Sequence, residues 1–281
     1  MRRTRLGGSR IMTQRIIFVV IALAFVGSGY LIGRYFLASL LQRPAGGEPV
    51  TKPNNNNDPA QGTTATLQVE TKPVSLYRVQ VGAFSTKENA DKVAGQVQGK
   101  GVGAAVAAPD PLYKVYCGAA ASKEAGEKLA QSAKSKLAGS VIGKNESLYV
   151  AGVTLASRSF TLSGDKALAE KLQSAFAKAD NAVQSLLSFW DALYLGKQNT
   201  VDLSSMDADL DALKADLTAA TPGSSLSEAH ASAVKIVTDL SAAVKGAKEA
   251  AGGDSSKAAD GATALVRALD TYAQELKKLS P

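Results

Sequence analysis

The sequence YRVQVGAF at Tyr77–Phe84 returns in closely similar form as YKVYCGAA at Tyr113–Ala120. Each copy passes through a polar break into a helical pattern, KENADKVAGQV after the first and KEAGEKLAQSAKSKL after the second. A repeat of this size indicates two related supersecondary units, neither of which buries its apolar face alone. We therefore expect the two copies to join into a single sheet.

Apolar and polar residues alternate along both copies, which predicts a β-strand in each. One face of these strands is mostly apolar and carries Tyr77, Val79, Val81, Tyr113, Val115 and Cys117. The opposite face carries Arg78, Gln80, Gly82, Lys114 and Tyr116. We expect the first face to pack against helices and the second to stay uncovered.

A helix is predicted after each strand. Ser85 is a candidate N-cap for the first helix, with Glu88 completing a capping box, and Ser122 is a candidate N-cap for the second. Apolar residues recur at three-four spacing in both helices, so each has one stripe to bury. The segment Gly103–Ala108 is expected to form the second strand.

The last strand is open between two positions, Ser140–Ile142 and Leu148–Leu155, and we favour the latter. The resulting order is β-α-β-β-α-β in a domain at residues 75–156. This is an α+β fold in which a four-stranded antiparallel sheet carries both helices on one face.

Residues 16–41 are predicted to form a transmembrane anchor, preceded by a cytoplasmic basic arm at residues 1–15. The stretch IIFVVIALAFVGSGYLIG is uncharged, and a helix of that length spans about 27 Å, close to the thickness of a bilayer core. Five arginines precede the stretch and two follow it, which orients the N-terminus to the cytoplasm and the later domains outside it. The alternative is a cleaved signal peptide, against which stand the length of the apolar region and the lack of a small-x-small site.

Residues 42–74 are predicted to be a flexible linker. They are rich in proline and contain an asparagine run at Asn54–Asn57. Because almost none of these residues suits a hydrophobic core, we expect the segment to behave as a spacer between the anchor and the first domain.

Residues 157–281 are predicted to form an all-α, up-and-down four-helix bundle. Apolar residues follow three-four spacing in four segments, which are separated at 196–200, 221–223 and 252–254. Ser225 and Glu228 form a second candidate capping box. Trp190 fits the apolar seam and is expected to fill the bundle core.

Charge and cysteine content exclude several classes of function. The net charge of +7 equals the seven arginines of residues 1–43, which contain no acidic residue, so the rest of the chain is balanced. This distribution indicates a membrane-orientation signal, and we expect no nucleic-acid partner. Cys117 is the only cysteine and His230 the only histidine, so one chain cannot form a disulfide or a zinc site of the usual ligands. No metal or cofactor is expected, and Cys117 is expected to be a small buried hydrophobe.

The motif YRVQVGAFS, with Asn89-Ala90 opening an amphipathic helix and a second copy of the unit following, resembles the SPOR (sporulation-related repeat) domain. The resemblance covers roughly residues 74–155 of the 281. The order of basic arm, membrane span, proline-rich spacer and domain also resembles the layout of this family. One departure is that Phe84 has no aromatic counterpart at Ala120.

The resemblance implies a module that binds bacterial peptidoglycan through the helix-free face of its sheet. It also implies a preference for glycan strands stripped of their peptide stems, which accumulate at division septa. On this basis the sequence predicts a glycan-binding site formed by Arg78, Gln80, Ser85, Asn89, Lys114 and Tyr116.

The chemistry of these side chains suits a sugar ligand. The amide of Gln80 both donates and accepts hydrogen bonds, and the ring of Tyr116 offers a flat amphipathic surface. Arg78 and Lys114 can pair with the lactyl carboxylate that remains once a stem peptide is removed. Ser85 and Asn89 would add hydrogen bonds at the rim, although both residue types also cap helices.

We therefore predict a non-catalytic, membrane-anchored protein that binds peptidoglycan at sites of wall remodelling in division or sporulation, with a second, protein-binding surface on the bundle. An enzyme is not expected, because one histidine cannot supply the ligands of a zinc amidase. The acidic residues of the bundle have the spacing of a solvated helix face rather than of a glycosidase pair. The remaining alternative is a protein-interaction scaffold in which sheet and bundle are both docking surfaces.

Overall fold

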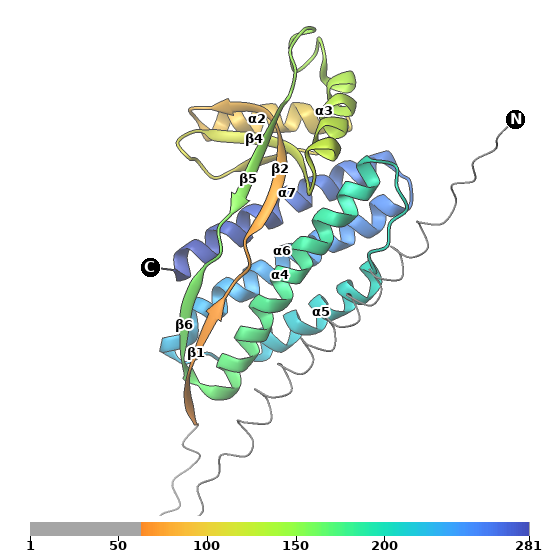
Figure 1. Ribbon diagram of the computed structural model, residues 1–281. Helices are drawn as coiled ribbons and strands as arrows, with labels where there is room; N and C mark the ends of the chain where they lie inside the picture. The colour runs from red at the N-terminus through yellow and green to blue at the C-terminus, as the bar shows by residue number, and fades with distance from the viewer. Residues whose placement is uncertain (1–62, 281) are drawn as a thin grey trace, which may run out of the picture. The chain divides into compact units, whose positions relative to one another are not determined.

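The computed structural model describes residues 63–280 (Figure 1). The predicted arm at residues 1–15, the predicted anchor at 16–41 and most of the predicted linker lie outside the described residues. Between residues 63 and 280, no helix is long and apolar enough to cross a membrane. The described residues belong to one compact unit, Ala60–Pro281.

The repeat forms the predicted four-stranded sheet. Its elements are β2 (Val74–Phe84), α2 (Lys87–Gln98), β3 (Ala105–Ala107), β4 (Tyr113–Ala120), α3 (Lys123–Leu137) and β5 (Tyr149–Leu155). The strands lie in the order β3-β4-β2-β5, and every neighbouring pair is antiparallel. The β-α-β-β-α-β order is therefore confirmed, and the last strand occupies the favoured of its two predicted positions.

Helices α2 and α3 cover one face of this sheet and enclose a small core. The core residues include Val79, Val97, Val115, Cys117 and Leu137. Ser122 caps α3 as predicted, since its hydroxyl accepts the N–H of Ala125 at 3.2 Å. The prediction for α2 is wrong by one position, because the N-cap is Thr86, whose hydroxyl accepts the N–H of Asn89 at 3.4 Å. Ser and Thr can both serve as N-caps, so the sequence alone does not choose between adjacent candidates.

A pair of strands outside the repeat was not predicted. Strand β1 (Thr64–Glu70) pairs antiparallel with β6 (Ser159–Asp165) as a separate two-stranded ribbon. The predicted linker at 42–74 therefore ends in ordered structure from Thr64 onward, and the predicted bundle at 157–281 begins with a strand. Pairing with a distant strand compensates for the weak apolar content of β1, whose only buried residue is Val69.

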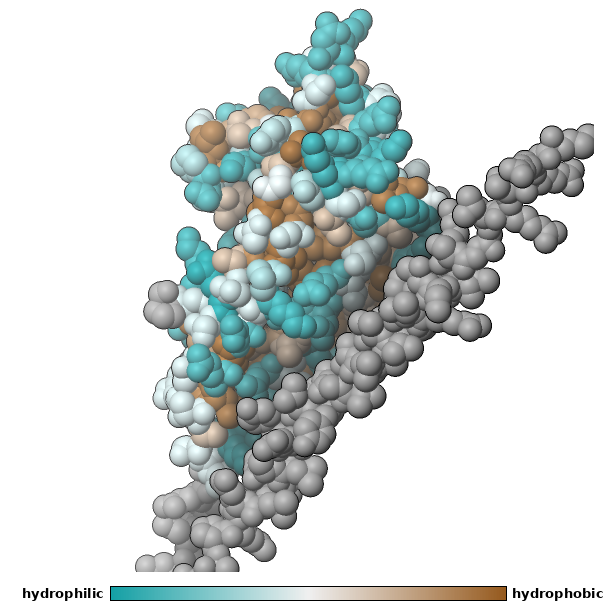
Figure 2. All heavy atoms as spheres, in the orientation of Figure 1, coloured by the Kyte–Doolittle hydropathy of each residue, from teal (hydrophilic) through white to brown (hydrophobic). Residues whose placement is uncertain are grey.

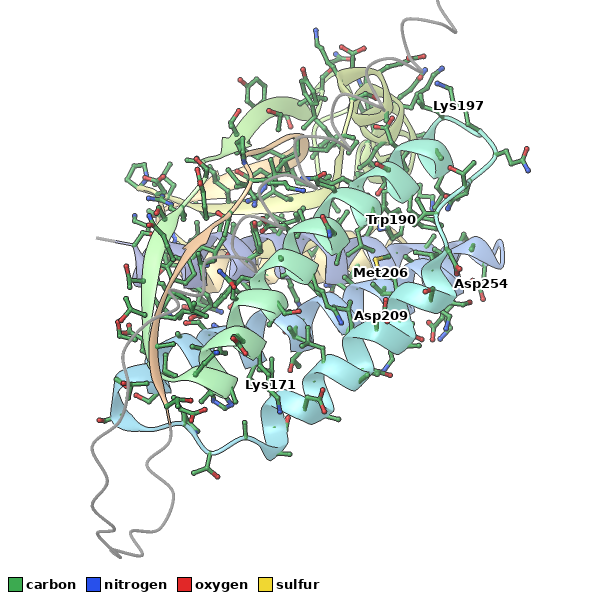
Figure 3. All side chains as sticks on the ribbon, turned by 60° about the horizontal axis from the view of Figure 1, so that its bottom comes forward. Lys171, Trp190, Lys197, Met206, Asp209 and Asp254 are labelled. Carbon is green, nitrogen blue, oxygen red and sulfur yellow. The ribbon has the colours of Figure 1, made fainter. Side chains whose placement is uncertain are left out.

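The four predicted bundle helices are present. They are α4 (Lys166–Tyr194), α5 (Leu203–Ala219), α6 (Ser227–Ala251) and α7 (Ser255–Leu279). Trp190 is 1% exposed, which confirms its predicted place in the core, and Figure 3 shows it between the helices. The predicted capping role of Ser225 is wrong, because Ser225 lies in a short 3-10 turn, Ser224–Leu226, and α6 starts at Ser227 without a side-chain cap. Burial of Leu226, at 1% exposed, holds this turn instead.

The second face of the sheet, expected to stay uncovered, packs against the bundle. Val74, Leu76 and Ala119 belong to the same hydrophobic core as the bundle helices, and α7 lies against β3 and β4. Figure 2 shows hydrophobic residues gathered along this boundary between strands and helices. Side chains alternate between the two faces of a strand, so Val74 and Leu76 lie on the same face as Arg78. These apolar side chains are buried there against the bundle.

Candidate functional site

The row of residues around Gln80 crosses the bundle-facing side of the sheet. Gln80 of β2 is the register partner of Tyr116 in β4 and of Tyr149 in β5. Residues directly opposite in neighbouring strands share a face, so these three side chains belong to one row. Two irregularities in the β2–β4 register, at Val79/Gln80 and Gln80/Gly82, flank this position. The predicted proximity of Gln80 and Tyr116 is therefore confirmed.

Exposure differs sharply along this row. Tyr116 is 6% exposed, Gln80 is half-buried and Tyr149 is 66% exposed. The β5 end of the row thus faces solvent, whereas the β4 end is covered. An exposed aromatic ring beside a half-exposed amide is an arrangement on which a sugar can stack and form hydrogen bonds.

Tyr149 was not among the predicted site residues. The strand that carries it was predicted, but the register between β5 and β2 was not, so the residue opposite Gln80 stayed unknown. The signal in the sequence that could have identified it is that Tyr149 is the one aromatic residue of the strand YVAGVTL.

Arg78 and Tyr116 are not exposed as predicted. Each is 6% exposed, and the guanidinium carbon of Arg78 lies 5.1 Å from the centre of the Tyr116 ring. Arg78 Nη1 is 3.9 Å from Oδ1 of Asp270 in α7. Among the described residues, Arg78 Nε has no hydrogen-bond partner. The structure thus brings these two predicted site residues together, but beneath a helix.

Helix α7 holds this part of the sheet through apolar and polar contacts. Val266 packs with Tyr116 and two alanines of β3 in a small buried cluster. The backbone N–H of Ala104 donates to Thr263 Oγ1 at 2.9 Å. The backbone N–H of Ala108 donates to Asp270 Oδ2 at 3.2 Å.

The remaining predicted site residues lie toward the other end of β2. Lys114 is half-buried and pairs in register with Ala83 of β2 and Ala107 of β3. Ser85 and Asn89 are exposed where β2 passes into α2. The contribution of these side chains to ligand binding stays a prediction.

A groove of about 370 Å³ lies between the β3–β4 turn, the end of β5 and the C-terminal half of α7. Its charged and amide side chains come from both parts of the molecule and are Asp110, Arg158, Asp270, Gln274 and Lys277. Because Asp270 lines the groove and also contacts Arg78, the groove borders the covered part of the sheet face.

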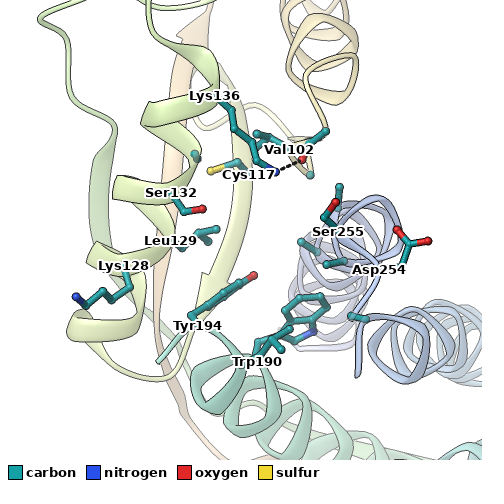
Figure 4. A pocket seen from close by; sticks show the side chains of 18 of the residues that line it. Val102, Cys117, Lys128, Leu129, Ser132, Lys136, Trp190, Tyr194, Asp254 and Ser255 are labelled. Carbon is teal, nitrogen blue, oxygen red and sulfur yellow. Dashed lines mark hydrogen bonds between the residues drawn. The ribbon is translucent and has the colours of Figure 1, made fainter. Parts of the chain in front are cut away.

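A second pocket, of about 350 Å³, lies between α3, α4 and the start of α7 and is partly open to solvent (Figure 4). Cys117, Leu129 and Tyr194 are among its lining residues. Cys117 is 1% exposed, in agreement with the prediction of a buried hydrophobe, and burial raises the pKa of its thiol to about 12. The thiolate is the nucleophile in cysteine chemistry, so this side chain is unreactive while it stays buried.

We expect Cys117 in the folded protein to resist iodoacetamide at about pH 8, a pH at which an ordinary thiol is partly ionised. In urea the same residue should react fully, because unfolding restores the ordinary pKa. Mass spectrometry follows the reaction without ambiguity, since the chain has one cysteine. Equal rates of labelling in buffer and in urea would contradict the burial of the thiol.

Two acidic residues of α5, Asp207 and Asp211, are engaged in ion pairs. Asp207 pairs with Lys248 at 2.6 Å and Asp211 with Lys245 at 3.1 Å. Hydrogen bonds from Ser241 and Lys245 lower the pKa of Asp211. Within residues 63–280, no group of three or more His, Cys, Asp or Glu side chains is placed to hold a metal ion.

Comparison with known proteins identifies one part of the chain. Residues 73–143 match the family model of the SPOR domain, whereas a comparison with curated proteins finds no match. A solved structure, the solution structure of the peptidoglycan binding domain of the B. subtilis cell wall lytic enzyme CwlC, is 35% identical in sequence. The aligned region covers 28% of this chain and 89% of that one, with a TM-score of 0.22. The two-copy repeat of Tyr77–Phe84 and Tyr113–Ala120 thus belongs to a SPOR domain at residues 73–143.

Proposed function

We propose that this protein is a non-catalytic peptidoglycan-binding protein whose SPOR domain docks on glycan strands poor in stem peptides. The SPOR match at residues 73–143 carries the proposal. The site is the open end of the row on the sheet, where Gln80 and the exposed Tyr149 lie opposite each other. The bundle adds a second surface for a protein partner.

The chemistry of this open end suits a glycan. The Tyr149 ring stacks on the apolar face of a sugar, and the Gln80 amide bonds to hydroxyl or N-acetyl groups. Lys114 is half-buried on the same side of the sheet and offers a positive charge to a lactyl carboxylate. No step in this function breaks a covalent bond.

The proposal includes a single membrane anchor at residues 16–41 with the N-terminus in the cytoplasm. It rests on the apolar stretch and on the five arginines before it against two after it. In that topology the SPOR domain works outside the cytoplasm, at sites where the wall is remodelled in division or sporulation.

A protein-interaction scaffold is the second candidate. The observation in its favour is that the same sheet face already holds a helix, through Val266 against Tyr116 and Asp270 near Arg78. A face that accepts one helix of its own chain has the shape and chemistry to accept a helix of another protein.

Sedimentation with purified sacculi tests glycan binding. The full chain in detergent micelles should bind sacculi treated with an amidase more strongly than untreated ones. Gln80→Ala should weaken this binding about fivefold, the value of one hydrogen bond, and Tyr149→Ala about tenfold, through loss of stacking.

Gln96→Ala provides the matched control, because Gln96 is exposed on α2, on the other side of the sheet. Equal and negligible retention of the wild-type chain on both kinds of sacculi would refute the proposed function. Retention of the wild type that neither substitution weakens would refute the assignment of the site.

A further inference from the structure

Helix α7 occupies the part of the sheet face next to the open site. We propose that α7 competes with the glycan for this face. The helix keeps Arg78 and Tyr116 covered until a glycan strand displaces it. This inference rests on the proposed function and adds its regulation.

Asp270 takes the place of a ligand's acidic group. Its carboxylate lies near the guanidinium of Arg78 and accepts the backbone N–H of Ala108. The lactyl carboxylate of a muramic acid residue without its stem carries the same charge and the same two acceptor oxygens. The glycan and Asp270 therefore compete for one cation.

The contact that Asp270 makes with Arg78 is incomplete. The Nη1–Oδ1 distance of 3.9 Å exceeds the 2.7–2.9 Å or so of a strong charged hydrogen bond. Among residues 63–280, the Nε of Arg78 finds no acceptor at all. A buried guanidinium with unused donors is better satisfied by a ligand that pairs with two of them at once. The incomplete contact therefore favours replacement of Asp270 by the carboxylate of the glycan.

Helix α7 can leave the sheet without losing its place in the bundle, because it has two separate stripes. One stripe packs in the bundle core and consists of Leu265, Leu269, Tyr272 and Leu276, while Ala262 lies at its edge, close to Gly103. The other meets the sheet and consists of Thr263, Val266 and Asp270. The SPOR domain likewise retains its own core under α2 and α3.

The contacts that remain closed define a pivot. Val74 and Leu76 at the start of β2 and Ala119 at the end of β4 are part of the bundle core, and Ser122 just after β4 donates to Asp191 of α4 at 2.7 Å. The contacts of Val266 and Asp270 lie further along the strands. A rotation about the start of β2 and the end of β4 therefore uncovers Arg78 and Tyr116 while the two parts stay joined. In the closed state only the Gln80–Tyr149 end of the face is available.

The double variant Val266→Lys/Asp270→Ala tests the competition. It places a second positive charge against Arg78 and removes the carboxylate, while the bundle stripe of α7 is unchanged. The full chain in detergent micelles carrying both substitutions should bind amidase-treated sacculi about tenfold more tightly than the wild type, because more of the protein is in the open state. Asp260→Ala, at an exposed acidic residue of the same helix, should leave binding as it is.

Hydrogen exchange provides a second readout. The amides of Ala104 and Ala108 donate to Thr263 and Asp270, so glycan strands released from amidase-treated sacculi should accelerate their exchange if α7 is displaced. Slower exchange of these amides on addition of glycan would overturn the inference, as would equal or weaker binding by the double variant. Absence of binding by both the wild type and the double variant would instead remove the proposed function itself. If circular dichroism shows a loss of helix in the double variant, the single variant Asp270→Asn replaces it, and tighter binding to amidase-treated sacculi is expected of that variant too.

Discussion

Gly261→Ala should destabilise the unit formed by residues 60–281 by about 2 to 3 kcal/mol, even though alanine favours helices. A Cβ on Gly261 of α7 would lie 2.5 Å from the carbonyl oxygen of Gly246 in α6 and 3.0 Å from Cζ2 of Trp190. The first of these atoms belongs to the backbone of a helix and cannot turn aside. The two helices must separate, which loosens the core around Trp190. Urea unfolding followed by circular dichroism measures the change.

Gly95→Ala is the matched control for this prediction. Gly95 lies inside α2, and a Cβ there would meet nothing within 4 Å. The substitution should stabilise the protein by about 0.5 to 1 kcal/mol, since alanine loses less backbone entropy in a helix. If both alanine variants were equally stable, the close crossing of α6 and α7 at Gly246 and Gly261 would be contradicted.

Asp180→Ala should cost about 2 to 4 kcal/mol of folding free energy, because it leaves buried donors without an acceptor. Asp180 is 3% exposed and accepts the hydroxyl of Tyr272 at 2.5 Å and the backbone N–H of Lys72 at 2.9 Å. Its carboxylate therefore joins α4, α7 and the segment between β1 and β2. Asp209→Ala, at an exposed residue of α5 (Figure 3), should change stability by less than about 0.5 kcal/mol.

The pH dependence of the same residue gives a further check. Burial raises the pKa of Asp180 above its ordinary value, more than the hydrogen bonds from Tyr272 and Lys72 lower it. Between the unfolded and folded pKa values the native state holds a proton that the unfolded state has lost, so stability falls as pH rises through that window. The free energy of unfolding of the wild type minus that of Asp180→Asn should thus be larger at acidic than at neutral pH. A difference that does not change with pH would contradict this environment for Asp180.

Much of the SPOR domain could be predicted from the sequence because its signals are local. Alternation over Tyr77–Phe84 and its repeat placed two strands, and three-four spacing placed the helices that cover them. Local signals also misplaced two caps, since Ser85 and Ser225 have side chains that could cap, but each lies one position before the residue at the N-cap.

The rest depended on contacts between distant parts of the chain. Strand β1 buries only Val69, and the partner strand that makes it ordered follows the whole SPOR domain. The cover over Arg78 and Tyr116 comes from Val266 and Asp270 of the last helix. Nothing in the pattern around Arg78 distinguishes a side chain that faces a sugar from one that faces a helix, because both surroundings suit a cation beside an aromatic ring.

The ribbon of β1 and β6 has a mechanical consequence. Strand β1 continues into β2 through residues 71–73, which form no turn, so the chain from Thr64 to Phe84 is almost continuously extended (Figure 1). Tension applied at Thr64 by the proposed tether would act along strands that are already extended and can lengthen little. The ladder to β6 and the hydrogen bond from Gln173 to the carbonyl of Gln68 would pass part of this load into α4. A wall-bound molecule could thus stay under strain without its sheet being pulled apart.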